Sequence, residues 1–331
     1  MKKFLLPAAA AVILAACGAE NNNENENENE NGADNTSGSE AEDGEVFEVA
    51  VIPSQSIGEM QEGLDRLEEH LADSLEMDVE VEHYPGYNAV VEAINFGHVD
   101  LAYFGPVTYL IAQESSGAEA VLTQTVDGDP YYHSYILTQP DAPWEDLDEL
   151  LEEVEDVSFA YGSQSSTSGF TIPAYELYDR GVYESESTYE FDSVQFTGSH
   201  DITANAIASG DVDAGAIDSA IFQALIEAGD IEEDDFKLLW ESEQLYQYPW
   251  AVPEGTSEER INDVQDAFTS IEDDEILSIF GGADAFIEIS PDEYDNVMEA
   301  ARHFDMLDPE TLEDDDDEEE DNEENNNEDD A

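Results

Sequence analysis

The chain has 331 residues, with 7 lysines and arginines against 86 aspartates and glutamates, which gives a formal net charge of −79. A surface this acidic repels polyanions, so nucleic acid is excluded as a partner. The length suffices for two domains, and a hydrophobic content of 40% suffices for their cores. So few lysines among so many carboxylates are typical of a halophilic protein, which works in molar salt, where charges are screened within about 3 Å.

The first 16 residues are typical of a secretory signal peptide, because two lysines precede an apolar run. The sequence LAACG, in which the cysteine is Cys17, resembles the bacterial lipobox, where the cysteine is diacylated and becomes the new N-terminus. Cys17 is the single cysteine, so no intramolecular disulfide can form. We therefore expect export and a lipid anchor on the outer face of the cytoplasmic membrane. An ordinary signal peptide with an incidental cysteine is the alternative.

Two segments are rich in acidic and amide side chains and poor in apolar ones, namely residues 17–45 and 313–331. Neither can bury a core, so we expect both to be disordered and to act as solvated spacers.

Strand-like and helix-like patterns alternate between these two segments. Strands are expected at 47–52, 79–84, 99–103, 120–126, 134–137, 157–160, 189–191, 214–217, 236–240 and 250–252. Helices are expected at 56–75, 87–96, 107–113, 147–151, after residue 170, and at 200–209, 220–228, 258–271, 274–280 and 291–303. This alternation predicts largely parallel sheets with helices on both faces, and the length favours two lobes with a cleft between them.

The stretch YGSQSSTSGF combines the features of an anion-binding turn. It follows a predicted strand and precedes a predicted helix, and the first N–H groups of a helix attract negative charge. Ser166, Thr167 and Ser168 would add three hydroxyls, although one of them could act only as an N-cap. Pro173 cannot donate to the carbonyl of Gly169, which predicts a kinked or frayed first turn.

Fixed positive charges are scarce beyond the signal peptide: they are Arg66, Arg180, Lys237, Arg260 and Arg302. An anion site in this chain should therefore use neutral donors and helix starts. Such donors lose less strength in brine than exposed charge pairs do.

Six segments, taken together, point to one family. They are YNAVVEA from residue 87, VDLAYFGP from 99, DPYYHS from 129, SSTSG from 165, GSHD from 198 and GDVDAGAIDS from 210. In this order and spacing the chain resembles the periplasmic phosphonate-, phosphite- and phosphate-binding proteins of ABC transporters, over nearly all of 46–303. The resemblance implies a type II periplasmic-binding-protein fold: two α/β lobes, each a mixed, mostly parallel sheet flanked by helices, which close on a ligand.

The resemblance also implies where the lobes divide. Lobe one would comprise residues 46–138 plus 247–312, and lobe two residues 139–246. The hinge would lie near 138–140 and 244–249, where prolines and polar residues suit linking segments.

The same resemblance implies a set of ligand-binding residues. Ser166, Thr167 and Ser168 would hold oxygens of the anion, while Tyr87 and Tyr132 would point phenol groups across the cleft. Core packing is the alternative for each tyrosine.

A histidine and an aspartate would complete the site. His200 would donate an N–H from a helix start, with Asp201 as the cap of that helix, although a structural role for His200 is the alternative. Asp218 would accept a P–OH hydrogen, which phosphorus oxyanions offer and sulfate at neutral pH does not; the alternative is that it only caps a helix. Further candidates for the wall of the site are Tyr103, Gln55, Ser56 and His133.

Together these features predict a substrate-binding lipoprotein that delivers a small phosphorus oxyanion to the permease subunits of an ABC transporter, as a monomer. Whether phosphonate, phosphite or phosphate is preferred stays open. A ligand-sensing receptor of the same fold and an extracellular phosphoester hydrolase are the alternatives. Catalysis, metal and cofactor are not expected, because the histidines lack spacing such as H-E-x-x-H and no G-x-S-x-G elbow is present.

Overall fold

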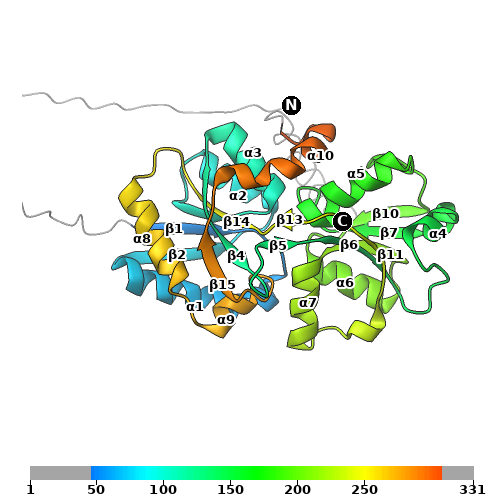
Figure 1. The fold of residues 1–331 in the computed structure, drawn as a ribbon, viewed down its shortest axis with the longest axis horizontal. Helices are drawn as coiled ribbons and strands as arrows, with labels where there is room; N and C mark the ends of the chain where they lie inside the picture. Colours follow the sequence, from blue (N-terminus) through cyan, green and yellow to red (C-terminus); the bar gives the residue numbers. More distant parts are fainter. Residues whose placement is uncertain (1–45, 308–331) are drawn as a thin grey trace, which may run out of the picture. The chain divides into compact units, whose positions relative to one another are not determined.

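A computed structural model of the protein describes residues 46–307, which form two lobes, each built on a mixed β-sheet (Figure 1). The expectations for the signal peptide, for Cys17 and for both acidic segments lie outside the described residues. Within 46–307, no helix has both the length and the apolar character that a membrane span would need.

Lobe one contains a six-stranded sheet in the order β15-β4-β14-β3-β1-β2. The strands are β1 (Val46–Val51), β2 (Asp78–His83), β3 (Leu101–Tyr103), β4 (Glu119–Thr125), β14 (Pro249–Val252) and β15 (Ala285–Glu288). The helices are α1 (Ile57–Leu75), α2 (Tyr87–Asn95), α3 (Pro106–Ser116), α8 (Glu258–Thr269) and α9 (Asp274–Ser278). Helix α1 packs with α8 and α9, and α2 packs with α3. The pattern of α1 explains its place: Leu64, Leu67 and Leu71 share one face and are buried, while most of the residues between them are exposed.

Lobe two contains a five-stranded sheet in the order β10-β7-β11-β6-β12. The strands are β6 (Ser134–Thr138), β7 (Ser158–Tyr161), β10 (Ser193–Phe196), β11 (Ala214–Asp218) and β12 (Lys237–Glu241). The helices are α4 (Leu147–Leu151), α5 (Ile172–Asp179), α6 (His200–Ser209) and α7 (Ser219–Ala228). Alternate residues of β7 enter different cores: Phe159 and Tyr161 join the core under α4 and α5, whereas Ala160 joins the core under α6 and α7. This alternation explains why the short apolar strands are buried on both faces.

Two chain segments join the lobes, and they pair with each other. β5 (Tyr131–Tyr132) runs antiparallel to β13 (Leu245–Tyr246). β6 pairs with β11 and β12, so residues 134–138 belong to lobe two, and their expected assignment to lobe one is wrong. The first crossing therefore lies before Ser134 and not at 138–140, because Pro140 follows the end of β6 instead of marking the hinge. The second crossing overlaps the expected one at 244–249.

Most predicted helices and strands are present, with ends shifted by a few residues, but three regions differ. The expected strand at 189–191 is replaced by a small hairpin, β8 (Tyr183–Ser185) and β9 (Thr188–Tyr189), followed by β10, and β15 was not expected. The last expected helix divides into a 3₁₀ segment, η4 (Pro291–Val297), and α10 (Met298–His303). The sheets also hold more antiparallel pairs than the alternation predicts, because β14 and β15 enter the first sheet after the chain returns from lobe two.

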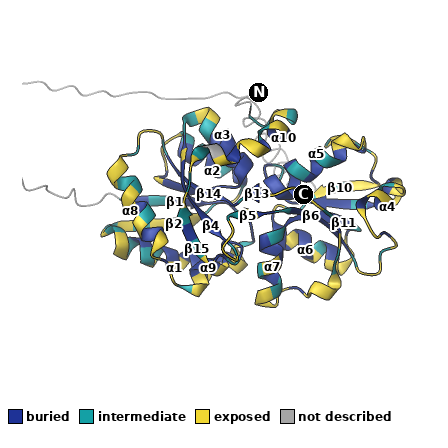
Figure 2. Cartoon of the chain, viewed as in Figure 1, coloured by how far each residue is buried: buried dark blue, intermediate teal, exposed yellow. Residues whose placement is uncertain are grey.

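Buried residues fill the two lobes and continue along the segments that link them, while the outer faces of the helices are exposed (Figure 2). The residues expected to bind the anion lie in this buried central region.

Candidate functional site

The hydroxyl-rich stretch forms a turn between β7 and α5. This turn, η2 (Thr167–Thr171), is π-helical: the N–H of Thr171 donates to the carbonyl of Ser166, five residues earlier, at 2.9 Å. The hydroxyl of Ser166 accepts the N–H of Gly169 at 3.0 Å, so Ser166 is the N-cap of the turn. Single π-helical turns of this kind are found frequently at functional sites.

Pro173 accounts for the irregular start of the helix. It leaves the carbonyl of Gly169 without its usual donor, and that carbonyl accepts the N–H of Gly162 at 2.9 Å instead. Where a kinked or frayed first turn was expected, the structure has a widened, π-helical turn. A side chain at Gly169 would not fit, because a Cβ atom there would lie 2.9 Å from the Ser166 hydroxyl and 3.0 Å from His200 Cε1.

The three hydroxyls of this turn are buried, each with an exposed fraction of 1% or less. The Thr167 hydroxyl accepts the N–H of Val107, at the start of α3 in lobe one, at 2.9 Å. The Ser168 hydroxyl lies 3.5 Å from a carboxyl oxygen of Asp218. The turn therefore contacts lobe one on one side and the end of β11 on the other.

Tyr87 begins α2 in lobe one, and Tyr132 lies in the linking strand β5. Both are buried, and neither hydroxyl makes a well-formed hydrogen bond within the described residues, although the hydroxyls of Ser166 and Ser168, respectively, lie near them. Burial raises the pKa of both phenols, while the nearby hydroxyls of Ser166 and Ser168, respectively, lower it. A buried polar atom without a partner costs about 1–3 kcal/mol, so these two hydroxyls indicate a place for a polar ligand atom.

His200 is the first residue of α6, and its ring is fully buried. Its Nδ1 accepts the N–H of Asp218 at 3.3 Å, which assigns the ring proton to Nε2. Nε2 lies 3.3 Å from the hydroxyl of Tyr248. Burial lowers the pKa of His200 to about 4, so the ring is a neutral hydrogen-bond donor at physiological pH.

Asp218 is the last residue of the buried strand β11 and the N-cap of α7. One of its oxygens, Oδ1, caps the helix by accepting the N–H groups of Ala220 at 2.7 Å and Ile221 at 3.0 Å. The other, Oδ2, faces Ser168. Burial raises the pKa of Asp218 to about 7, although hydrogen bonds from the two N–H groups, Tyr248 and Ser168 lower it in part. The capping role is real, but it occupies only one oxygen.

The sequence did not indicate Tyr248, which lies between His200 and Asp218 and packs edge-on against Tyr132 at a ring distance of 5.5 Å. The one feature of the sequence that could have indicated Tyr248 is its position in the predicted second crossing between the lobes, at 244–249. Tyr103 packs beside Tyr248, with ring centres 5.6 Å apart, and its hydroxyl accepts the side-chain N–H of Gln124 at 2.8 Å.

Four hydrogen bonds join the lobes around this cluster. They are Val107 N–H to Thr167 Oγ1 at 2.9 Å, Ser165 Oγ to Asn88 Oδ1 at 2.7 Å, His200 N–H to Ser54 O at 3.0 Å, and Ser56 N–H to Asp201 Oδ1 at 3.0 Å. The lobes are therefore closed over the buried cluster. The last bond also corrects the role expected of Asp201, because its carboxylate accepts an N–H from the other lobe and not from its own helix.

The remaining wall candidates and the cations make their contacts elsewhere. The side chain of Gln55 donates to the carbonyl of Ile279, and Nδ1 of His133 lies 2.8 Å from the carbonyl of Ser242. Arg66, Arg180 and Lys237 pair with surface carboxylates. In the described part of the chain, the polar groups that meet at this cluster are thus hydroxyls, N–H groups, one neutral imidazole and one carboxyl.

Two α/β lobes that close over a buried polar cluster next to the linking strands are the architecture of a periplasmic solute-binding protein. A family model described as "ABC transporter, phosphonate, periplasmic substrate-binding protein" matches residues 49–294. The chain therefore belongs to this family of exported transporter components.

Named relatives agree with this assignment. The chain is 30% identical over 231 residues to the phosphate-import protein PhnD of Mycolicibacterium smegmatis, covering 68% of this chain and 71% of that protein. It is 25% identical over 271 residues to a probable ABC transporter phosphite binding protein, PhnD1, of Prochlorococcus marinus, covering 78% and 89%. The solved structure of PhnD1 with methylphosphonate matches with a TM-score of 0.69 at 22% identity, covering 78% of this chain and 98% of that one. These relatives are named as transporter binding or import proteins.

Proposed function

We propose that this protein captures a small phosphorus oxyanion between its lobes and delivers it to the permease subunits of an ABC transporter. In this proposal it works as a monomer, and a lipid on Cys17 anchors it to the outer face of the cytoplasmic membrane. The ligand class is supported by the relatives, whose names and ligand contain phosphate, phosphite and methylphosphonate.

The observation that carries the proposal is the pair of buried phenol hydroxyls of Tyr87 and Tyr132, which make no well-formed hydrogen bond and whose pKa values the charge of Asp218 helps to raise. Phenol hydroxyls donate to oxygens, and a carboxylate accepts from an acid proton. A monoanion with both P–O and P–OH groups satisfies both kinds of partner at once. Sulfate at neutral pH has no such proton, and beside the ionised form of Asp218 it would leave two negative groups in contact.

Each ligand-binding residue predicted from the sequence has a part in this proposal. Ser166, Thr167 and Ser168 offer hydroxyls at a helix start, His200 offers its Nε2 proton, and the tyrosines offer phenol hydrogens. Asp218 accepts the proton of the ligand through Oδ2, and Tyr103 forms part of the wall. Tyr248 joins them because it lies between the imidazole and the carboxyl.

Binding should be measured by calorimetric titration with phosphate, phosphite, methylphosphonate, 2-aminoethylphosphonate and sulfate in molar NaCl. We expect at least one phosphorus oxyanion to bind and sulfate not to bind. Tyr87→Phe should weaken binding about tenfold, since a hydrogen bond to a charged group contributes roughly 1.5–3 kcal/mol.

The matched control is Tyr161→Phe. This hydroxyl is also buried without a partner, but its ring belongs to the core of lobe two. Affinity should therefore stay unchanged in this variant. A folded protein that binds none of the four phosphorus ligands would overturn the proposal.

The anchor can be tested separately in cells. Cys17→Ser should move the protein from the membrane fraction to the soluble exported fraction, because the thiol that carries the lipid is gone. Unchanged membrane association would argue against lipid at this position.

A further inference from the structure

The described chain ends with a segment that passes from one lobe to the other. After η4, residues 298–307 run along α3 of lobe one and reach α5 of lobe two, as the orange segment in Figure 1 shows. We call residues 298–307 the strap.

The residues just before the strap are anchored in the core of lobe one. Tyr294 and Val297, which precede it, are fully buried in the core of that lobe. The Tyr294 hydroxyl donates to the carbonyl of Gln247 at 2.8 Å, and its ring lies 5.1 Å from that of Tyr109 in α3. Ala301, within the strap, belongs to the same core.

The far end of the strap contacts lobe two at the hydroxyl-rich turn. The ring of Phe304 lies 5.5 Å from Phe170 and 6.3 Å from Tyr183. The sulfur of Met306 lies 3.3 Å from the hydroxyl of Thr171, whose one hydrogen is shared between this sulfur and the carbonyl of Ser166 at 3.1 Å. Phe170 and Thr171 belong to η2, so the strap holds the outer side of the turn whose inner side carries the candidate anion-binding hydroxyls.

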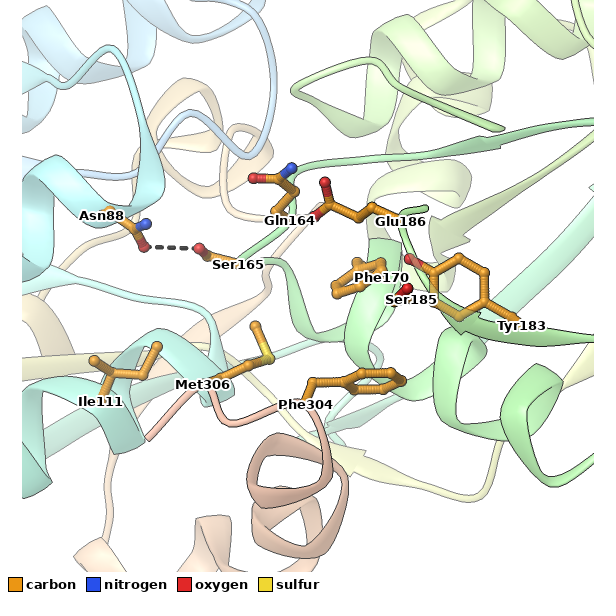
Figure 3. A pocket seen from close by; sticks show the side chains of 10 residues that line it. All are labelled: Asn88, Ile111, Gln164, Ser165, Phe170, Tyr183, Ser185, Glu186, Phe304 and Met306. Carbon is orange, nitrogen blue, oxygen red and sulfur yellow. Dashed lines mark hydrogen bonds between the residues drawn. The ribbon is translucent and has the colours of Figure 1, made fainter. Parts of the chain in front are cut away.

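A cavity of about 270 Å³ lies at this meeting point. Phe304 and Met306 border it on one side, Phe170 on another, and the Ser165–Asn88 hydrogen bond between the lobes closes a third (Figure 3). The strap, the turn and an interlobe bond thus share one small region of the molecule.

We propose that Phe304 and Met306 are positioning residues, which hold η2 in its ligand-binding position once the lobes have closed and so slow the release of the ligand. This inference rests on the proposed function of η2. Because the strap is based in lobe one, its contacts with η2 cross the lobe boundary and break when the lobes open. Contacts made only in the closed form change the rate of dissociation more than the rate of encounter.

The test compares Phe304→Ala with Met298→Ala in the full chain. Both substitutions truncate an apolar side chain of the same segment, but Met298 packs against the core of lobe one. Stopped-flow fluorescence with phosphate and with methylphosphonate should show about a tenfold faster dissociation for Phe304→Ala, with the association rate within twofold of the wild type. Met298→Ala should leave both rates unchanged, and Phe304→Leu should recover part of the loss.

A second measurement does not depend on a ligand. Amide hydrogen exchange of residues 167–171 should be faster in Phe304→Ala than in the wild type, and unchanged in Met298→Ala. If the wild type binds none of the four phosphorus ligands, the proposed function fails, while the exchange measurement still decides whether the strap holds η2. If the wild type binds a probe and Phe304→Ala releases it at the wild-type rate, the strap proposal is overturned. It is also overturned if amide exchange at η2 is the same in Phe304→Ala as in the wild type.

Discussion

Asp218 uses its two carboxyl oxygens for different purposes. Oδ1 caps α7, while Oδ2 faces the hydroxyl of Ser168 beside the candidate site. Burial raises the pKa of this carboxyl to about 7, so that at neutral pH a proton is readily shared between it and a bound oxyanion. One proton in the complex then belongs to the pair of groups and not to either alone.

This arrangement predicts a pH dependence of affinity. Above about pH 8, free Asp218 and free phosphate or methylphosphonate have each lost the shared proton, so binding must take one up. Affinity should therefore fall by about tenfold per pH unit as pH rises, which calorimetry between pH 7 and 10 would measure.

Asp218→Asn is the informative variant for this prediction. Its amide oxygen can still cap α7, and its NH₂ group can donate to a fully deprotonated anion. The fall in affinity with pH should be shallower, and sulfate should begin to bind. The same slope in wild type and variant would contradict the role given to the shared proton.

At the residue scale, local sequence patterns could indicate which side chains come together, but not all of their hydrogen-bond partners. Thr167, Ser168, His200 and Asp218 come together because each stands at a helix start at the carboxyl end of a strand or just after it, which the sequence makes visible. Asp201 accepts the N–H of Ser56 in lobe one only because the lobes are closed, and no local sequence pattern encodes that closure.

At the scale of elements, the π-helical turn η2 depends on a proline and a glycine together. Pro173 frees a carbonyl, and the lack of a side chain at Gly169 lets Ser166 and His200 approach the backbone. The sequence showed the missing donor at Pro173. It could not show the close approach of His200, which comes from a distant helix.

Gly169→Ala should therefore damage the site. The added methyl would lie 2.9 Å from the Ser166 hydroxyl and 3.0 Å from His200 Cε1, so the turn must shift, and overpacking of this kind costs about 1–3 kcal/mol. We expect at least a tenfold loss of affinity together with a lower melting temperature. Both can be followed by calorimetry.

Gly58→Ala provides the control for this substitution. Gly58 lies in the first turn of α1 with no atom within 4 Å of the added methyl. Alanine is the better helix former, so this variant should bind as the wild type does and melt no earlier. Equal affinity in both glycine variants would show that close packing at η2 is not needed for binding.

Whole elements could be predicted where the hydrophobic pattern was long. They could not be predicted where strand pairing decides which sheet a segment joins. Helix α1 is visible from its leucines alone, and α6 was placed with the bounds that it has. The lobe boundary implied by the resemblance puts β6 in the wrong lobe, and the apolar run by itself does not say which sheet it joins. β15 was overlooked because four residues carry too little periodicity to mark a strand.

At the scale of the whole molecule, the dominant feature is the net charge of −79. Like charges repel one another more in the folded protein than in the expanded chain, and salt screens this repulsion. The melting temperature should therefore rise steadily between 0.1 and 2 M NaCl at pH 7.5, as measured by calorimetry or circular dichroism.

The same titration at pH 4 is the control, because much of the carboxylate charge is then neutralised. The effect of salt on the melting temperature should shrink there. A melting temperature that does not respond to NaCl at pH 7.5 would refute the halophilic interpretation.

The composition predicts a halophilic protein, and for such a protein the chemistry of the closed cluster has a consequence. A pocket lined with guanidinium or ammonium groups would attract halide ions, which in such a medium vastly outnumber any scarce nutrient. Here the acidic group of the cluster is Asp218, and its ionised form repels chloride, which brings no hydrogen to share with it. The carboxyl that selects the nutrient would thus also keep the background electrolyte from occupying its place.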